Sequence, residues 1–188
     1  MARPHPDTRS VMAAGRPVVV GPGSLAALDR WLASEARGAQ RVVVGDENTL
    51  RHGLPELLAL VPGLREAPSI AVPPGEASKG IGTCHALWSH LAGLGIERGA
   101  VLVALGGGVV TDLAGFVGAT FKRGLRVVNV PTSLMGMVDA AIGGKTAIDL
   151  DGVKNLVGLV RQPEGVYVHP PFLRTLGKRE LLNGVAEM

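Results

Sequence analysis

Short apolar runs alternate with longer amphipathic segments along most of this chain. The runs have the length of buried strands, and the longer segments repeat their apolar residues at helical spacing. This pattern predicts strands at 18–20, 41–45, 69–72, 100–105, 126–130 and 166–168, a hairpin strand at 146–149, and helices at 25–36, 54–61, 80–92, 109–120, 132–141, 171–176 and 179–188. Strands that alternate with helices form mainly parallel sheets, so we expect a Rossmann-like α/β domain with helices flanking its sheet.

Three consecutive glycines, Gly106 to Gly108, lie where the strand at 100–105 meets the following helix. Glycine lets the backbone approach a ligand closely, and a helix N-terminus offers free N–H donors and the positive end of its dipole. The turn is therefore either a plain strand-to-helix connection or a cradle for phosphate or pyrophosphate. It lacks the spacing of the dinucleotide fingerprint. Asp112 follows in the first turns of the helix, where it could favour the helix dipole or accept hydrogen bonds from ligand hydroxyls.

Several cations follow the glycine turn in the sequence. Lys145 belongs to a Gly-Gly-Lys-Thr run that lacks the first glycine of a nucleotide-binding phosphate loop, so we reject a nucleoside triphosphatase. Lys145, Lys154, Lys122 and Arg123 are either solvated surface charges or a group that converges on a phosphorylated or carboxylated substrate.

Composition excludes several classes of function. Aromatic residues make up only 3% of the chain, which argues against a surface that stacks nucleic-acid bases, and the net charge of +3 is scattered. No apolar run reaches the roughly 20 residues of a membrane span. The single cysteine, Cys84, excludes an internal disulfide, and we expect a cytoplasmic protein with a disordered tail at residues 1–10. The five histidines form no recognisable zinc set, and Glu187 alone is not a metal site.

Six motifs, in order, resemble those of the 3-dehydroquinate synthase family. They are PGEASK (74–79), LGGGVVTDLAGF (105–116), KRG (122–124), PTSLMGMVDAAIGGKT (131–146), GVKN (152–155) and GVAE (184–187). The resemblance implies an N-terminal α/β domain that binds NAD, here residues 11–176, and a helical C-terminal domain that begins at residues 177–188. It further implies an active site between the two domains with a divalent metal, zinc or cobalt, and a homodimer in the full-length enzyme.

The resemblance also implies roles for individual residues. NAD would be contacted by Asp46, Asn48, Glu76, Lys79, Gly107, Gly108, Val109, Asp112, Thr132, Ser133, Phe172, Leu173, Arg174 and Thr175. Lys145 and Lys154 would lie between nicotinamide and substrate, and Asp139 and Asn155 would contact the substrate. Arg123 would reach the substrate phosphate of a neighbouring subunit. Glu187 would be the first metal ligand.

The implied reaction converts 3-deoxy-D-arabino-heptulosonate 7-phosphate to 3-dehydroquinate and phosphate. NAD would transiently oxidise a ring hydroxyl, which acidifies the neighbouring C–H and allows phosphate to leave. Reduction, ring opening and an intramolecular aldol step would follow, without net redox change. Metal and lysine would polarise the oxidised oxygen.

Two departures from the family pattern leave alternatives open. Ala140 and Ala141 stand where many members have two serines, although Gly143, Gly144 and Lys145 are kept. Related sedoheptulose 7-phosphate cyclases of the same superfamily tend to differ at these three residues, so 3-dehydroquinate synthase is preferred. Such a cyclase and a non-catalytic NAD-binding module are the alternative functions. The sequence also stops inside a predicted helix, before the metal-binding histidines of the family, so we expect an incomplete chain that is inactive by itself.

Overall fold

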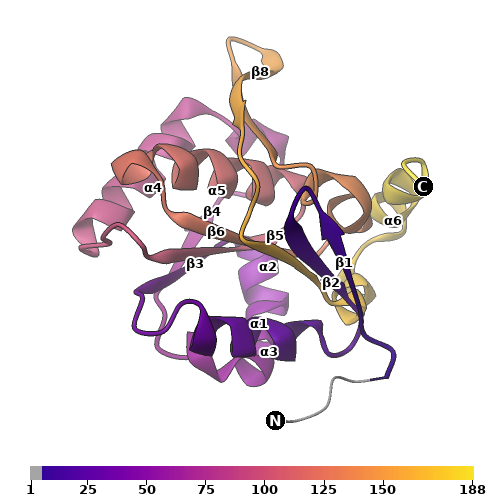
Figure 1. Cartoon of the computed structure of the whole chain (residues 1–188). Helices are drawn as coiled ribbons and strands as arrows, with labels where there is room; N and C mark the ends of the chain where they lie inside the picture. The colour runs from indigo at the N-terminus through magenta and orange to yellow at the C-terminus, as the bar shows by residue number, and fades with distance from the viewer. Residues whose placement is uncertain (1–5) are drawn as a thin grey trace.

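A seven-stranded sheet forms the centre of the computed structural model, which describes residues 6–188 (Figure 1). Its strands lie in the order β1 (Arg9–Ala13), β2 (Arg16–Val20), β9 (Gly165–Val168), β6 (Arg126–Pro131), β5 (Val101–Gly106), β3 (Arg41–Asp46) and β4 (Ser69–Val72). Every neighbouring pair is parallel except β1 and β2, which form an antiparallel hairpin at one edge. The predicted mainly parallel sheet is confirmed.

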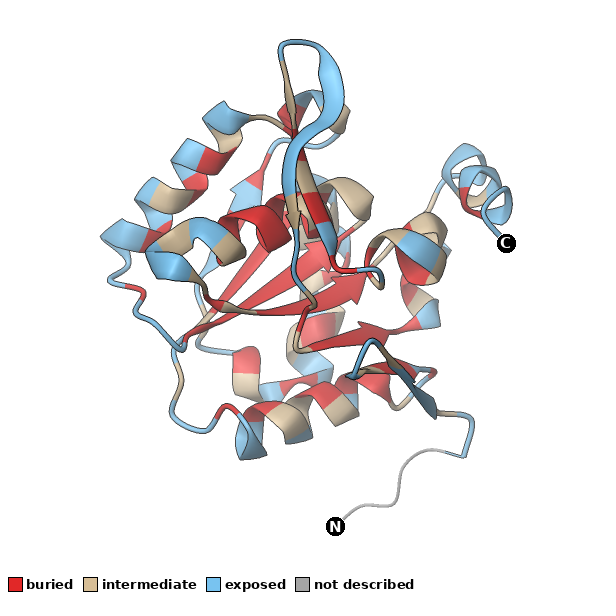
Figure 2. Cartoon of the chain, turned by 45° about the horizontal axis from the view of Figure 1, so that its top comes forward, coloured by how far each residue is buried: buried red, intermediate tan, exposed pale blue. Residues whose placement is uncertain are grey.

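The central strands are buried on both faces, as Figure 2 shows. All six residues of β5 are buried, and so are Val42, Val43 and Val44 of β3. Continuous apolar runs of this kind are typical of parallel strands covered by helices on both sides. This explains why the strands could be recognised in the sequence by unbroken hydrophobicity rather than by alternation.

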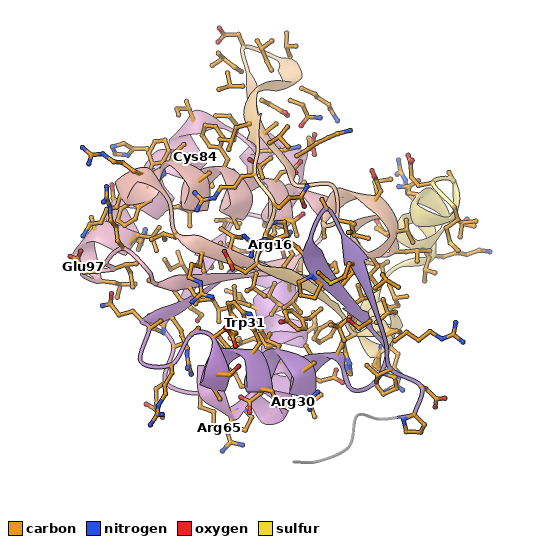
Figure 3. All side chains as sticks on the ribbon, in the orientation of Figure 1. Arg16, Arg30, Trp31, Arg65, Cys84 and Glu97 are labelled. Carbon is orange, nitrogen blue, oxygen red and sulfur yellow. The ribbon has the colours of Figure 1, made fainter. Side chains whose placement is uncertain are left out.

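Helices cover both faces of the sheet. One face carries α1 (Ser24–Ser34), α2 (Glu47–His52), α3 (Leu54–Leu60) and the 3-10 turn η1 (Pro62–Leu64), whose leucines share a core with β9 and β6. The other face carries α4 (Ile81–Gly93) and α5 (Gly108–Thr120), which form a second core with β3, β4 and β5. Cys84 lies in this second core on α4 (Figure 3). Among residues 6–188, no helix combines the length and the hydrophobicity that crossing a bilayer requires.

A separate hairpin projects from the body of the domain (Figures 1 and 3). It consists of β7 (Lys145–Leu150) and β8 (Val153–Val160), so the predicted hairpin strand at 146–149 is confirmed. The base of β7 packs on α5, where a Cβ added at Gly115 would lie 2.3 Å from the Thr146 Cγ2. Most of β8 is exposed to solvent. The hairpin is therefore anchored on α5 at the start of β7.

The remaining segments are short. They are the 3-10 turns η2 (Glu76–Ser78), η3 (Phe121–Arg123) and η5 (Pro170–Thr175), the π-helical turn η4 (Gly136–Ala140) and the helix α6 (Lys178–Val185). A Cβ added at Gly184 would lie 2.6 Å from the Leu134 Cβ, so α6 rests against the segment that follows β6.

Three sequence-based expectations differ from the structure. Of the predicted disordered tail at 1–10, residues 1–5 lie outside the described part of the chain, but Arg9 and Ser10 belong to β1 and pair with Val20 and Val19. Ladder hydrogen bonds to β2 order this segment. The predicted helices at 132–141 and 171–176 are instead the π-helical turn Gly136–Ala140 and the 3-10 turn Pro170–Thr175, whose backbone hydrogen bonds differ in spacing from those of an α-helix.

Candidate functional site

The predicted NAD residues follow the carboxyl ends of five parallel strands. Asp46 ends β3 and Asn48 follows it, Glu76 and Lys79 follow β4, Gly107 to Asp112 follow β5, Thr132 and Ser133 follow β6, and Phe172 to Thr175 follow β9. The carboxyl ends of parallel strands share one edge of the sheet, where open α/β folds bind their ligands. The structure therefore gathers segments that are more than a hundred residues apart along one edge.

The glycine turn is shaped by close contacts rather than by left-handed backbone. Gly107 is the N-cap of α5 with an extended conformation (φ −77°, ψ −168°), and no side chain caps the helix. A Cβ at Gly106 would lie 2.4 Å from the Val110 Cβ, and one at Gly107 would lie 3.0 Å from the Ser133 Oγ. The N–H groups in the first turn of α5 therefore have no side-chain partner, and the adjacent glycines add no side chain that could cover them. This is the geometry of an anion cradle.

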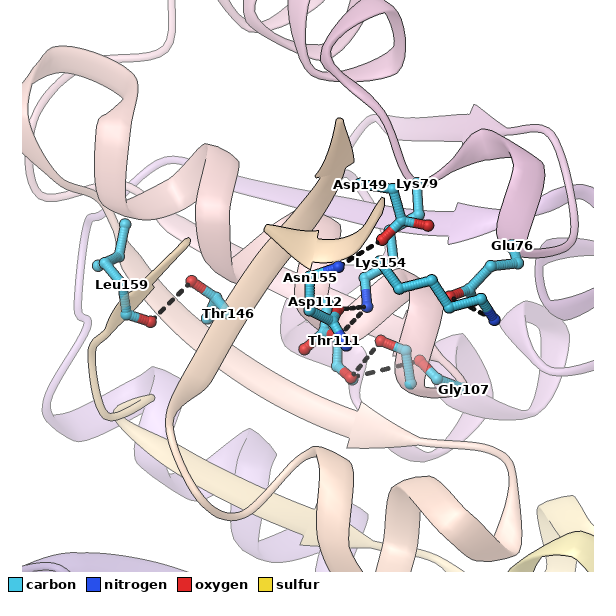
Figure 4. Close-up of polar contacts among 11 residues, drawn as sticks. Glu76, Lys79, Gly107, Thr111, Asp112, Thr146, Asp149, Lys154, Asn155 and Leu159 are labelled. Atoms are coloured by element: carbon cyan, nitrogen blue, oxygen red, sulfur yellow. Dashed lines mark hydrogen bonds and ion pairs between the residues drawn. The ribbon is translucent and has the colours of Figure 1, made fainter. Parts of the chain in front are cut away.

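A buried ion pair joins the loop after β4 to helix α5 (Figure 4). The Lys79 Nζ lies 2.5 Å from the Asp112 Oδ2, and the two side chains are 5% and 18% exposed. Burial raises the pKa of Asp112, and the charges of Glu76 and Asp139 raise it further, whereas Lys79 lowers it by hydrogen bonding and by charge. Asp112 is thus the counter-ion of Lys79, a role that sequence reasoning did not foresee.

The tip of the β7–β8 hairpin reaches the same cluster. The Lys79 Nζ donates a hydrogen bond of 2.5 Å to the Asn155 Oδ1, and the Lys154 Nζ lies 3.3 Å from the Glu76 Oε1. The structure thus brings Glu76, Lys79, Asp112, Lys154 and Asn155 into one connected group. Asp139 is close enough to affect the pKa of Asp112. Residues predicted for cofactor and for substrate therefore meet here.

Other predicted residues lie outside this group. Arg123 follows the far end of α5, which at 1.5 Å per residue is roughly 20 Å from the glycine turn. Lys145 is exposed at the start of β7 and makes no ion pair among residues 6–188. The Phe172 side chain is buried in the core and packs edge-on against His169, so its ring faces the interior of the domain.

The loop after β3 is held by interactions of its own. The Asp46 side chain caps α2 by accepting a hydrogen bond of 2.8 Å from the Thr49 N–H. The Thr49 hydroxyl donates to the Leu105 carbonyl at 2.9 Å, which ties α2 to β5. Asn48 is exposed between these two residues. The sequence did not indicate these bonds of Thr49, although an aspartate at the end of a strand is a helix N-cap signal that could have indicated the first of them.

The predicted metal ligand has no companions in the described chain. Glu187 is exposed just beyond α6. Within residues 6–188 no three His, Cys, Asp or Glu side chains are grouped so that they could hold a metal ion. A catalytic zinc takes three protein ligands, so these residues do not fit a complete metal centre.

The family model and two sequence relatives name the same family. The family model for the 3-dehydroquinate synthase N-terminal region matches residues 69–183. A 3-dehydroquinate synthase of Parabacteroides distasonis is 44% identical over 146 residues, which cover 78% of this chain and 41% of that protein. One from Lactococcus lactis subsp. cremoris is 38% identical over 172 residues, which cover 91% of this chain and 48% of that protein.

Two solved structures of other synthases share the fold of this chain. The 2-epi-5-epi-valiolone synthase of Streptomyces hygroscopicus, solved with NAD+ and Zn2+ bound, is 31% identical with a TM-score of 0.78, over 95% of this chain and 49% of that chain. A 2-deoxy-scyllo-inosose synthase with a TM-score of 0.82 is 24% identical and shows the shared fold. The chain spans about half the length of the curated relatives it matches. Because the family match covers more than half of the chain and includes the motifs that meet at this edge of the sheet, the chain belongs to the 3-dehydroquinate synthase family.

Proposed function

We propose that this chain forms the NAD-binding half of a 3-dehydroquinate synthase. The observation that carries the proposal is the uncapped N-terminus of α5, which opens onto the glycine turn at the carboxyl edge of the sheet. Backbone N–H groups and the positive end of the helix dipole together favour a pyrophosphate. The related valiolone synthase was solved with NAD+ bound, which supports the choice of dinucleotide.

The residues present fit a dinucleotide. Gly107 and Gly108 leave room for its phosphates, and Thr132 and Ser133 lie beside them after β6. Asp112 offers a carboxylate that could accept hydrogen bonds from hydroxyl groups, while Lys79 holds this carboxylate in place. Asp46 and Asn48, on the neighbouring loop, lie toward the adenosine side in this arrangement. When bound, NAD supplies a hydride acceptor and donor, which no amino-acid side chain can provide.

The proposed substrate is a phosphorylated heptulosonate, 3-deoxy-D-arabino-heptulosonate 7-phosphate. Lys154 carries its positive charge on the hairpin tip beside Glu76, and Asn155 and Asp139 add hydrogen-bonding groups. Lys145, at the base of the same hairpin, adds a second exposed cation. These groups suit an anionic, hydroxyl-rich ligand, and in the proposed carbon–oxygen lyase reaction they would orient the sugar and balance its charge.

Other parts of the assignment rest on the family. We propose that residues 177–188 begin a second, helical domain, and that the enzyme works as a cytoplasmic homodimer in which Arg123 serves the neighbouring subunit. Its exposed place beyond α5, far from the glycine turn of its own chain, suits this role. A divalent metal enters only through Glu187, one ligand where three are needed, so we derive no step through it.

Calorimetric titration with NAD+ tests the proposal. We expect the chain to bind NAD+, and Gly107→Val to weaken binding at least tenfold by filling the cradle beside Ser133. Gly82→Val is the matched control, because a Cβ at Gly82 on α4 meets nothing within 4 Å. The absence of NAD+ binding, or equal binding by Gly107→Val, would contradict the proposed cradle.

A phosphate-release assay separates catalysis from binding. With NAD+, zinc and the heptulosonate phosphate, we expect no turnover by residues 1–188 alone, because the described residues form no three-ligand metal site. Rapid turnover would contradict that expectation. Preference for sedoheptulose 7-phosphate in the binding assay would favour the alternative cyclase, whereas NAD+ binding without affinity for either sugar would favour a non-catalytic module.

A further inference from the structure

The tip of the β7–β8 hairpin has an unusual backbone. Asp151, Gly152 and Asn155 have positive φ angles of 51°, 81° and 55°. Such left-handed conformations are uncommon for residues other than glycine, and they persist where surrounding interactions enforce them. Residues 151–158 are exposed, so core packing does not enforce the conformation. Asn155 is held instead by Asp149 of the same hairpin and by Lys79 of the loop after β4.

Asp149 connects the hairpin to that loop. Its backbone N–H donates to the Lys79 carbonyl at 2.7 Å, in an isolated bridge that pairs Asp149 with Gly80. Its Oδ1 accepts a hydrogen bond of 2.8 Å from the Asn155 backbone N–H (Figure 4). The Asp149 carboxylate therefore stabilises the turn of the hairpin and holds Asn155 next to the loop after β4.

Lys79 then decides which way the Asn155 amide faces. An ammonium group has only donors, so it binds the Oδ1 of Asn155 rather than the Nδ2. Lys79 is itself fixed by burial and by Asp112. The Asn155 Nδ2 has no bonding partner among residues 6–188, which leaves a hydrogen-bond donor as the free end of the side chain.

We propose that Asp149 is a positioning residue that, together with Lys79, orients Asn155 so that its amide presents a donor to an acceptor oxygen of a bound ligand. Such an oxygen belongs to a phosphate, a carboxylate or a hydroxyl group. Lys154, next to Asn155, adds a positive charge on the same tip. The ligand part of this inference rests on the proposed function; the orientation of Asn155 does not.

Amide hydrogen exchange and side-chain NMR of Asn155 test the orientation directly. Asp149→Ala removes the acceptor, so we expect exchange of the Asn155 backbone amide to rise about tenfold. Asp149→Asn keeps an acceptor oxygen and should restore most of the protection. Asp151→Asn is the matched control: Asp151 lies in the same turn with a positive φ, and its carboxylate has no partner among residues 6–188. Unchanged exchange in Asp149→Ala would overturn the proposal.

A second pair of variants covers the case in which Asp149→Ala does not fold. Asp149→Glu keeps the charge but moves the carboxylate by one methylene, whereas Asp149→Asn keeps the position of the oxygen and loses the charge. If the position of the oxygen matters, the Asn155 backbone amide should exchange faster in Asp149→Glu and at nearly the parental rate in Asp149→Asn. The opposite order would show that charge, not position, matters, and would overturn the proposal.

Binding measurements address the ligand. With NAD+ present, we expect Asp149→Ala to weaken affinity for 3-deoxy-D-arabino-heptulosonate 7-phosphate about tenfold, and Asp149→Asn to recover most of it. Affinity for NAD+ alone should change less than twofold. If the parent chain binds no sugar phosphate, the proposed function fails while the exchange experiment still decides the role of Asp149. If Asp149→Ala binds the sugar like its parent, the donor role of Asn155 is refuted.

Discussion

Replacing Lys79 by methionine removes a buried charge and little volume. The Lys79 ammonium, 5% exposed, is held 2.5 Å from the Asp112 Oδ2 and also donates to Asn155. Methionine keeps an unbranched apolar stem of similar length, so packing around the stem should survive. What remains is the largely buried carboxylate of Asp112 without its cation. The variant therefore isolates the ion pair from the surrounding core.

The cost follows from the burial of the pair. Removing one partner of a buried ion pair destabilises a protein by about 3–5 kcal/mol, because the other charge stays buried without compensation. The Asp112 side chain keeps 18% of its surface exposed and can take up a proton, so we expect the lower end, about 3 kcal/mol. For a chain of this length each kcal/mol lowers Tm by roughly 2–4 °C, which gives a decrease of roughly 6–12 °C.

The cost should also depend on pH. Without Lys79, the influences on the pKa of Asp112 that remain are burial, Glu76 and Asp139, and all of them raise it. A carboxyl whose pKa is higher in the folded state than in the unfolded state binds its proton more tightly when folded. Stability then rises as pH falls through the raised folded pKa, and the gain is complete below the unfolded value near 3.8. The deficit of Lys79→Met should therefore be largest at pH 7 and should shrink toward pH 4.

Urea unfolding of four chains measures these effects: the parent, Lys79→Met, Asp112→Asn and the double variant, each at pH 7 and pH 4. We expect the double variant to be less destabilised than the sum of the single ones by about 2 kcal/mol, since each single variant leaves one unpaired group. Additive losses, or a Lys79→Met deficit that is equal at both pH values, would refute the assignment of Asp112 as the counter-ion of Lys79.

Three further predictions follow from buried positions. Gly115→Ala places a methyl group 2.3 Å from the Thr146 Cγ2 and should lower the free energy of unfolding in urea by about 1–3 kcal/mol. Gly82→Ala is the control: nothing lies within 4 Å of its added methyl group, so it should be neutral or stabilising by up to about 1 kcal/mol. Equal effects of the two variants would contradict the packing of β7 on α5. Burial raises the pKa of Cys84 to about 11, so iodoacetamide at pH 8 should label it only in denaturant, as mass spectrometry can show. Burial raises the pKa of Tyr167, the only tyrosine, to about 12; the folded chain should show no phenolate absorbance at pH 10.5, and stability should fall as pH rises from 10 toward 12.

Much of the fold could be predicted because its strands are continuous apolar runs. The expected strands at 41–45, 69–72 and 100–105 correspond to β3, β4 and β5 within one residue. The strand β1 was missed because both of its faces are exposed and Arg9 and Ser10 break its apolar run. The helix α2 was missed as well, since it is only six residues long and contains no fully buried residue. Both elements form because of residues that are near in space, more than because of their own pattern of apolar residues.

The sequence by itself determined the order of most strands and helices along the chain, the position of the glycine turn and the motifs that show the family. These features are local: a hydrophobic run, three adjacent glycines and short motifs can each be read without knowing the rest of the chain. Only the tertiary structure decided that Lys79 pairs with Asp112 and orients Asn155, which lies 76 residues further along the chain. The parallel sheet brings such partners together, because it gathers the ends of distant strands at one edge. Burial then favours their pairing, because an unpaired buried charge is costly.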